Sequence, residues 1–353
     1  MLIGLCGGIC AGKHSVADYL VEQLGFSKLY LARTAATPLV EKSASEARVP
    51  VLNRAPRETS TDDETFLTVQ ALVDFVTKRW QQRWVTTDVW DEAVLEMLSR
   101  RPFFILVSVD APVSIRWSRF KERCELYNQQ SPTLEEFVVR NDDHLYDAVS
   151  GLARLINRAE VRLVNSTSSL EQLRDALKDL DLANEQRLRP SWDQYFMQLA
   201  SLAAQRSNCM KRRVGCVLVR EKRVISTGYN GTPRNLRNCN EGGCPRCNDG
   251  YGAGVELSTC LCIHAEENAL LEAGRERIRE RSILYCDTCP CLTCSIKITQ
   301  VGISEVVYSQ AYSMDRKAAA VFAEGGIMLR QFSPPRKGLV HLDHVSEART
   351  ARQ

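Results

Sequence analysis

His264-Ala265-Glu266 and, after a short apolar run, Pro290-Cys291-Leu292-Thr293-Cys294 are the stretches that decide the fold and chemistry of this chain. The first supplies a histidine and a carboxylate, and the second supplies two cysteines in a CxxC pair. A structural zinc site is closed by four protein ligands, whereas a catalytic site keeps one position for water. His264, Cys291 and Cys294 leave that position open. The pattern therefore predicts a catalytic zinc ion, with Glu266 close enough to handle a proton.

This combination of H-x-E and P-C-x-x-C is typical of zinc-dependent nucleobase deaminases. Zinc lowers the pKa of a bound water to about 7, and we expect the resulting hydroxide to attack C4 of a cytosine ring. Glu266 would take the proton and deliver it to ring N3 and then to the departing amine. A lone histidine is more often a core residue, but the glutamate and the two downstream cysteines favour metal binding by His264.

Length, charge and the start of the chain limit the class of protein. The 353 residues predict two domains, each with its own core. The net charge of +3 gives no electrostatic reason to expect a nucleic-acid or membrane partner. Residues 1–5 lack the basic and apolar regions of a secretory signal, and no run reaches the roughly 18 apolar residues of a membrane span. We expect a cytoplasmic protein, with the nucleus left open.

The first residues predict a strand, a glycine-rich loop and a helix. An apolar run from Leu2 to Cys6 precedes the loop, in which Gly7, Gly12 and Lys13 fit the phosphate-binding pattern G-x-x-x-x-G-K. Backbone N–H groups at a helix start would cradle a phosphate there, and Lys13 would add a positive charge. The alternative for Lys13 is a solvated lysine at a helix start.

Residues 1–181 resemble P-loop kinases of the nucleotide and dephospho-coenzyme A type. A parallel sheet is implied, with a central strand over 103–110 and a basic helix after it. The position after Lys13 should be serine or threonine to hold magnesium, but His14 stands there and Ser15 is one residue late. We therefore expect a degenerate kinase fold, and the alternative is an active nucleotide kinase fused to a zinc domain.

The rest of the chain predicts a linker, an α/β domain and a tail. Residues 182–190 form a polar connection that ends at a proline, and residues 334–353 look like a loose C-terminal tail. Between them, residues 191–333 alternate between helical and strand patterns. A helix at their start carries an apolar stripe that we expect to face the core: Trp192, Tyr195, Phe196, Leu199 and Leu202.

Three motifs give residues 191–333 a close resemblance to deoxycytidylate deaminases. They are residues 228–234 (GYNGTPR), residues 264–268 (HAEEN) and residues 290–294 (PCLTC). The resemblance implies a three-layer α/β/α domain of the cytidine-deaminase type. It also implies the hydrolysis of dCMP to dUMP and ammonia, in which the dUMP is used for thymidylate synthesis. It places the zinc ligands at the starts of two neighbouring helices. Cys286 and Cys289 form a second, overlapping CxxC pair, but the family pattern places proline just before the ligand pair, which favours the later one.

The resemblance also implies contacts with the substrate and with regulators. Asn230 would bond the sugar or base of dCMP, and Arg275 and Tyr312 would bind its 5′-phosphate. Arg275 could equally be a solvated charge at a helix end. Family members are typically activated by dCTP with Mg²⁺, inhibited by dTTP and commonly hexameric, so we expect a homo-oligomer. The residues expected to bind these effectors are Gly228, Tyr229, Asn230, Gly231 and Arg234.

Cysteines are concentrated in the second half, where eleven of the fourteen lie between residues 209 and 294. Without a secretory signal, metal binding is favoured over disulfides. Some deoxycytidylate deaminases carry a second, structural zinc ion in this region, and four cysteines could close a tetrahedral site here. Cys209 and Cys239 match ligand positions in such members; where those members use histidine, this chain has Gly254 and Ser258. The alternative is free buried thiols. The candidates are Cys209, Cys239, Cys244, Cys247, Cys260 and Cys262.

Other functions remain open at this point. A deaminase of tRNA or of free nucleosides would share the zinc motif, although residues 228–234 and the Glu267-Asn268 extension favour the monophosphate substrate. A binding module with a purely structural zinc ion is the alternative from another class. The presence of Glu266 argues against that module.

Overall fold

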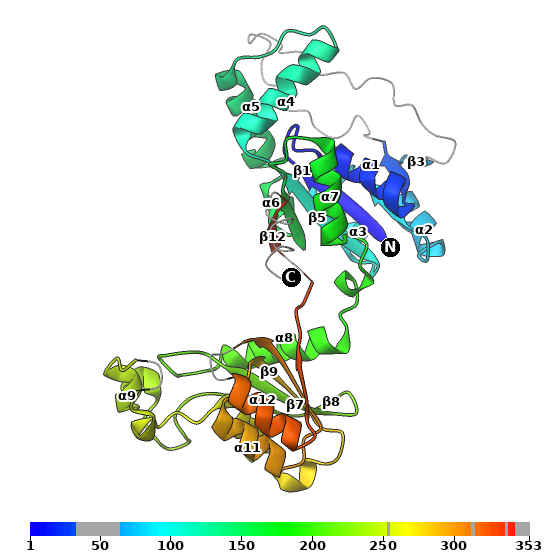
Figure 1. Cartoon of the computed structure of the whole chain (residues 1–353). Helices are drawn as coiled ribbons and strands as arrows, with labels where there is room; N and C mark the ends of the chain where they lie inside the picture. Colours follow the sequence, from blue (N-terminus) through cyan, green and yellow to red (C-terminus); the bar gives the residue numbers. More distant parts are fainter. Residues whose placement is uncertain (33–63, 253–254, 312–314, 336–337, 343–353) are drawn as a thin grey trace. The chain divides into compact units, whose positions relative to one another are not determined.

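The computed structural model describes residues 1–32, 64–252, 255–311, 315–335 and 338–342. The chain divides into two compact units (Figure 1). The first unit contains residues up to Arg189 together with the described residues after Pro334, and the second contains Pro190–Pro334. Among the described residues, no helix combines the length and the apolar character that crossing a membrane requires.

The first unit is built on a seven-stranded sheet in which every strand pair is parallel. The strand order is β12-β6-β5-β1-β4-β2-β3. All six residues of β1 are buried, as expected for a central strand covered on both faces. The strands are β1 (Leu2–Gly7), β2 (Ser27–Leu31), β3 (Glu64–Phe66), β4 (Trp84–Thr86), β5 (Phe104–Asp110), β6 (Val161–Val164) and β12 (Gly338–His341).

Helices cover both faces of this sheet. Helices α1 and α7 pack on the face that contains Ile3 and Leu5, and α2, α3 and α6 pack on the face that contains Leu2 and Cys6. The helices are α1 (Lys13–Leu24), α2 (Val69–Lys78), α3 (Glu92–Ser99), α4 (Val113–Leu126), α5 (Leu134–Tyr146), α6 (Ala153–Asn157), α7 (Leu170–Leu180) and the 3-10 helix η1 (Glu185–Arg187).

Two expectations at the edges of this unit are wrong. Residues 338–341 of the expected tail form β12, which adds to the sheet edge by pairing with β6. Residues 182–189 are not a free linker, because Leu182 is fully buried in the core and Ala183 and Leu188 pack against it. In both places a few apolar residues are buried although most of their sequence neighbours are polar, so the composition of the segment did not predict the burial.

The second unit contains a mixed five-stranded sheet with the order β11-β10-β9-β7-β8. Strand β7 is antiparallel to β8 and β9, while β9, β10 and β11 run parallel. The strands are β7 (Gly215–Arg220), β8 (Arg223–Tyr229), β9 (Ile283–Thr288), β10 (Glu305–Gln310) and β11 (Met328–Gln331). The helices are α8 (Trp192–Ala204), α9 (Pro245–Asn248), α10 (Ala265–Ala273), α11 (Leu292–Gln300), α12 (Asp315–Glu324) and the 3-10 helices η2 (Cys239–Glu241), η3 (Leu257–Thr259) and η4 (Arg275–Arg277).

The five-stranded sheet is the middle of three layers, in agreement with the expected α/β/α arrangement. Helices α10, α11 and α12 pack on one face and α8 packs on the other. The predicted buried stripe of α8 is confirmed for Phe196 and Leu199, which pack in the core, and wrong for Trp192 and Tyr195, which are 45% exposed. Helix α8 also buries Met197 and Ala200 against β7 and β9.

Candidate active site and metal centres

The three expected zinc ligands come together at the starts of two neighbouring helices. His264 is the N-cap residue of α10, and Cys291 is the N-cap residue of α11. Nδ1 of His264 lies 3.3 Å from Sγ of Cys294 and 3.4 Å from Sγ of Cys291. Bond lengths of about 2.0 Å to nitrogen and 2.3 Å to sulfur separate such atoms by about 3.5 Å in a tetrahedral zinc site. The three residues therefore fit a zinc ion that binds His264 through Nδ1.

The environment of these ligands suits a catalytic metal. His264 is exposed, Cys291 is half-buried and Cys294 is buried, so the group opens to solvent on the histidine side. The hydrogen bond from Cys294 lowers the pKa of the Cys291 thiol to about 3. Both cysteines also lie at a helix N-terminus, which favours thiolates.

Glu266 lies in the first turn of α10 and is 4% exposed. Its burial raises the pKa of the carboxyl to about 7. A carboxyl group with a pKa near the working pH can both accept and donate a proton, which is the property required of a general acid and base.

The structure shows which of the two overlapping CxxC pairs lies beside His264. Cys294 and Cys291 face His264, whereas Cys286 is buried in β9 opposite Cys216 of β7. Cys289 is buried as well, and its backbone N–H bonds the carbonyl oxygen of Gln310 at 2.9 Å.

The segment 228–234 positions the helix that carries His264 and Glu266. A Cβ atom on Gly228 would lie 2.1 Å from the carbonyl oxygen of Ala265, so only glycine lets β8 approach α10 this closely. Gly231 exchanges two backbone hydrogen bonds with Ile263, the residue before His264. Two of the five residues expected to bind effectors therefore have structural roles: Gly228 in helix packing and Gly231 in backbone pairing.

An ion pair missed from the sequence joins the two ligand helices. Lys297 of α11 donates to the carboxylate of Glu267 in α10 at 2.7 Å. The residues are 30 positions apart, so no local pattern revealed the contact. This contact helps to fix the helix carrying Cys294 against the helix carrying His264.

The structure describes two of the three residues expected to contact the substrate, Asn230 and Arg275. The side chain of Asn230 is buried; it accepts from Ser207 and from the backbone of Val214 and donates to the carbonyl oxygen of Arg212. Arg275 is exposed at the far end of α10, nine residues or roughly 13 Å along the helix from Glu266. Contact of Arg275 with the 5′-phosphate of the substrate stays a prediction. Tyr312 lies outside the described residues.

Tyr229 and Arg234 are the exposed members of the expected effector set. Tyr229 ends β8, and its carbonyl oxygen accepts from Asn268 of α10 at 2.8 Å. Arg234 pairs with Glu272 of α10 at 3.3 Å across an open surface.

The five cysteines of the insert between β8 and α10 gather in one cluster with Cys209. Their sulfur atoms form two groups of four, and within each group all atoms lie within 4.8 Å of one another. The first group is Cys209, Cys239, Cys247 and Cys262, and the second is Cys244, Cys247, Cys260 and Cys262. None of these cysteines forms a disulfide.

The glycine-rich loop of the first unit borders a cavity of about 730 Å³. Gly12 and Lys13 line it, together with the basic residues Arg119, Arg123 and Arg140. Gly7 does not line the cavity; it lets the loop leave β1 beside β5, where a Cβ atom would lie 1.9 Å from the carbonyl oxygen of Val109.

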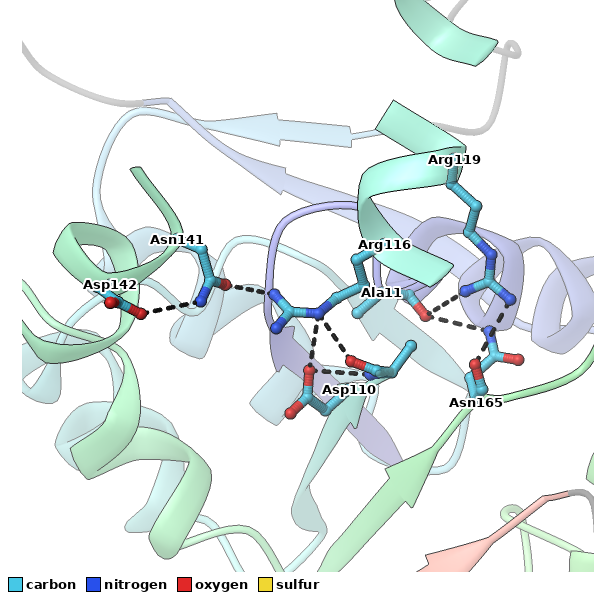
Figure 2. Close-up of polar contacts among 8 residues, drawn as sticks. Ala11, Asp110, Arg116, Arg119, Asn141, Asp142 and Asn165 are labelled. Carbon is cyan, nitrogen blue, oxygen red and sulfur yellow. Dashed lines mark hydrogen bonds and ion pairs between the residues drawn. The ribbon is translucent and has the colours of Figure 1, made fainter. Parts of the chain in front are cut away.

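Side chains from distant segments hold this loop (Figure 2). Arg119 and the Asn165 amide both donate to the carbonyl oxygen of Ala11, at 3.4 and 3.0 Å. Arg116 bonds the carbonyl oxygen of Ala111 at 2.7 Å and pairs with Asp110 at 3.4 Å. Within α4, Arg119 therefore holds the loop, and Arg116 holds the end of β5.

Comparison with known proteins places the chain in a family. Residues 190–310 match the model of the cytidine and deoxycytidylate deaminase zinc-binding region. A deoxycytidylate deaminase of Schizosaccharomyces pombe is 47% identical over 338 residues, which cover 96% of this chain and 99% of the relative. One from Saccharomyces cerevisiae is 49% identical over 273 residues, 75% of this chain and 86% of the relative.

A solved structure also resembles part of the chain. It is the dCMP deaminase of cyanophage S-TIM5 in complex with dCMP and dUMP, with 28% identity and a TM-score of 0.34 over 41% of this chain and 98% of that one. The sequence match with the Schizosaccharomyces pombe relative spans both units. With that match and the converging zinc ligands, the chain belongs to the deoxycytidylate deaminase family.

Proposed function

We propose that this chain is a zinc-dependent hydrolase that converts dCMP to dUMP and ammonia, and thereby supplies dUMP for thymidylate synthesis. The observation that carries the proposal is the convergence of Nδ1 of His264 with the sulfur atoms of Cys291 and Cys294 near the buried carboxyl of Glu266. Membership of the deoxycytidylate deaminase family supports dCMP as the substrate.

Each residue has a defined task in this reaction. His264, Cys291 and Cys294 would hold zinc, which when bound supplies a Lewis acid that activates water at neutral pH. Glu266 would accept one proton from the attacking water and deliver it to ring N3, and would then transfer the second proton, from the hydroxyl group added at C4, to the departing amine. The pKa of about 7 lets the same carboxyl perform both transfers. Asn230 would act by holding residues 207–214 in place, since its side chain bonds three of them.

The experiment offers the purified full-length protein dCMP, dCTP, deoxycytidine and CMP, and measures ammonia release. We expect deamination of dCMP in preference to the other three. Rapid release from deoxycytidine would instead favour a nucleoside deaminase, and phosphate transfer from ATP without ammonia release would favour the kinase alternative.

We also propose regulation by dCTP with Mg²⁺ as activator and dTTP as inhibitor, in a homo-oligomer that we expect to be a hexamer. Tyr229 and Arg234 support an effector site, because both are exposed and both contact α10. The exposed Trp192 and Tyr195 support self-association. Effectors would act through different affinities for two subunit arrangements.

The test records dCMP saturation curves with each triphosphate and with neither, on protein whose mass in solution is measured. Arg234→Ala should weaken the response, and Lys13→Ala should leave it intact. A hyperbolic curve that neither triphosphate shifts would reject the regulation. Loss of the response in Lys13→Ala would move the effector site to the first unit.

For the first unit we propose binding of a phosphate group without appreciable phosphoryl transfer. The cavity beside Gly12 and Lys13, with several arginines on its walls, supports anion binding. His14 stands where a magnesium-binding hydroxyl is expected, which argues against transfer. The cysteines of the insert, with Cys209, would bind structural zinc.

A further inference from the structure

We propose that the six clustered cysteines hold two zinc ions that share two thiolates, instead of one ion bound by four cysteines. The two groups of four sulfur atoms have Cys247 and Cys262 in common. These two would bridge the ions. Cys209 and Cys239 would complete the first ion, and Cys244 and Cys260 would complete the second. This inference concerns the insert and does not depend on the deaminase reaction.

The sulfur spacings fit a tetrahedral metal in both groups. Sγ atoms lie 3.8 Å apart for Cys209 and Cys247, 3.9 Å apart for Cys247 and Cys262, and 3.9 Å apart for Cys244 and Cys260. Zinc–sulfur bonds of about 2.3 Å at tetrahedral angles separate two sulfurs by about 3.8 Å. A disulfide would bring them to about 2.05 Å. The same spacing recurs in the first group, in the shared pair and in the second group.

A single ion would leave two of the six cysteines without a metal. An ion in the first group leaves Cys244 and Cys260 unused, and an ion in the second leaves Cys209 and Cys239 unused. One unshared sulfur in each group receives a backbone N–H group, as thiolate ligands do. The backbone N–H of Met210 points to Cys239 and that of Leu261 to Cys244, each at 3.4 Å.

A positive charge accompanies the second group. Arg246 is 8% exposed, and its Nη1 lies 3.9 Å from Sγ of Cys260. Its other nitrogens bond the carbonyl oxygens of Val255 and Gly252. A metal-bound thiolate at Cys260 would place a compensating negative charge beside this buried guanidinium.

The described part of the insert has no hydrocarbon core of its own. Its buried cluster consists of cysteines alone, four of them at most 9% exposed. Its larger apolar side chains are exposed; they are Leu236, Tyr251, Val255, Leu257 and Leu261. Its regular structure is limited to η2, α9 and η3, each of at most four residues. Metal binding can supply the folding free energy that such a segment lacks.

The ligand set selects zinc. Tetrahedral sites made only of thiolates suit zinc or iron–sulfur clusters. An iron–sulfur cluster is held by four cysteines, whereas this cluster brings six together and shares two of them between the groups. Two zinc ions use every sulfur.

The first test counts zinc in the full-length protein by elemental analysis. We expect three ions per chain, one for each of the three groups of ligand atoms. Cys291→Ser should lower the count to two, which separates the cluster from the catalytic ion. X-ray absorption at the zinc edge should show a zinc–zinc distance of roughly 3 Å, because two tetrahedra with 2.3 Å bonds share an edge.

Two variants distinguish two ions from one. Cys209 is unshared in the first group and Cys260 in the second. With two ions, Cys209→Ser and Cys260→Ser should each lower the zinc count. With one ion, one of these variants would keep the full count. Cys124→Ala, a change at a buried cysteine of the first unit, is the control and should keep three.

The wild-type measurements decide the question even if a cluster variant does not fold. A count of two zinc ions without a zinc–zinc distance would overturn the binuclear cluster. Iron or copper in place of zinc in the insert would overturn the metal assignment. A count of three in both the wild type and Cys291→Ser would instead contradict the proposed catalytic site.

Discussion

Gly228 gives a direct test of how the catalytic helix is positioned. In Gly228→Ala the new Cβ atom would lie 2.1 Å from the carbonyl oxygen of Ala265 and 2.5 Å from the backbone nitrogen of Ala269. Both contacts are backbone atoms of α10, which cannot move aside as a flexible side chain would. Restoring an ordinary carbon–oxygen separation therefore requires α10 to shift by about 1 Å.

That shift would move Glu266 and His264 together, because both lie at the start of α10. A misplacement of about 1 Å can lower a reaction rate about 100-fold, and overpacking costs about 1–3 kcal/mol of stability. We expect losses of this size in kcat/KM for dCMP without effectors and in the free energy of unfolding. Zinc content, measured in parallel, separates a misplaced Glu266 from a lost metal.

Gly252→Ala is the matched control, since the nearest atom to its Cβ would be 3.7 Å away. It should leave both quantities unchanged. If Gly228→Ala has normal stability and normal activity, the close packing of β8 on α10 does not position the site. If it loses only the response to dCTP or dTTP, Gly228 serves the effector site and our reasoning about packing is wrong.

Four further predictions concern separate parts of the molecule. Glu266→Gln should keep its zinc and lose at least about 100-fold in turnover, since it removes a general acid and base; normal activity would refute the assigned role. Cys291→Ala should lose one zinc ion and the activity together, and active metal-depleted protein would contradict ligation by Cys291. For Asp193, burial alone would raise the pKa, but hydrogen bonds from Arg330 and Tyr285 hold it below its usual value. The resulting stabilisation is present above the unfolded pKa of about 4 and is lost as the pH falls through the lower folded pKa. Asp193→Asn should therefore lower the free energy of unfolding by about 1 kcal/mol at pH 7, a modest value because the ion pair is partly exposed. Melting curves of wild type and variant at pH 7 and pH 3 should show a smaller difference at pH 3. Lys13→Ala should leave dCMP deamination unchanged, and the wild type should transfer no phosphate from ATP; transfer that disappears in Lys13→Ala would mean that Ser15 replaces the missing hydroxyl.

The zinc ligands could be predicted from sequence because their chemistry is local. The His264 and Cys291 motifs each begin a helix, and the spacing within each motif fixes the geometry at that helix start. Which of the two CxxC pairs faces His264 depended on the family pattern, and the structure brings the later pair to the histidine.

The cysteine cluster could not be paired from sequence. Its sulfurs come from three separated segments, around Cys209, from Cys239 to Cys247, and from Cys260 to Cys262. Only the folded insert shows that Cys247 and Cys262 are common to both groups. The number of cysteines therefore indicated metal binding, while the number of ions depended on the three-dimensional arrangement.

Helix α8 shows why an apolar stripe can mislead. The largest apolar residues of the helix suggested one face, but the buried face contains Ala200, which lies against β7. A Cβ atom on Gly215 would lie 1.9 Å from the carbonyl oxygen of Ala200, so helix and strand meet through their smallest residues. Because helix and strand approach this closely, the large side chains of Trp192 and Tyr195 do not fit between them, although their size and apolar character made them the strongest candidates for burial in the sequence.

The most direct test of the proposed zinc site is ammonia release from dCMP by zinc-loaded wild-type protein and by Glu266→Gln, with zinc counted in both. We expect the wild type to produce dUMP and ammonia in equal amounts and the variant to retain its zinc but lose at least about 100-fold in rate. Failure of the wild type to release ammonia from dCMP, or full activity in the variant, would contradict the assignment of the site formed by His264, Cys291, Cys294 and Glu266.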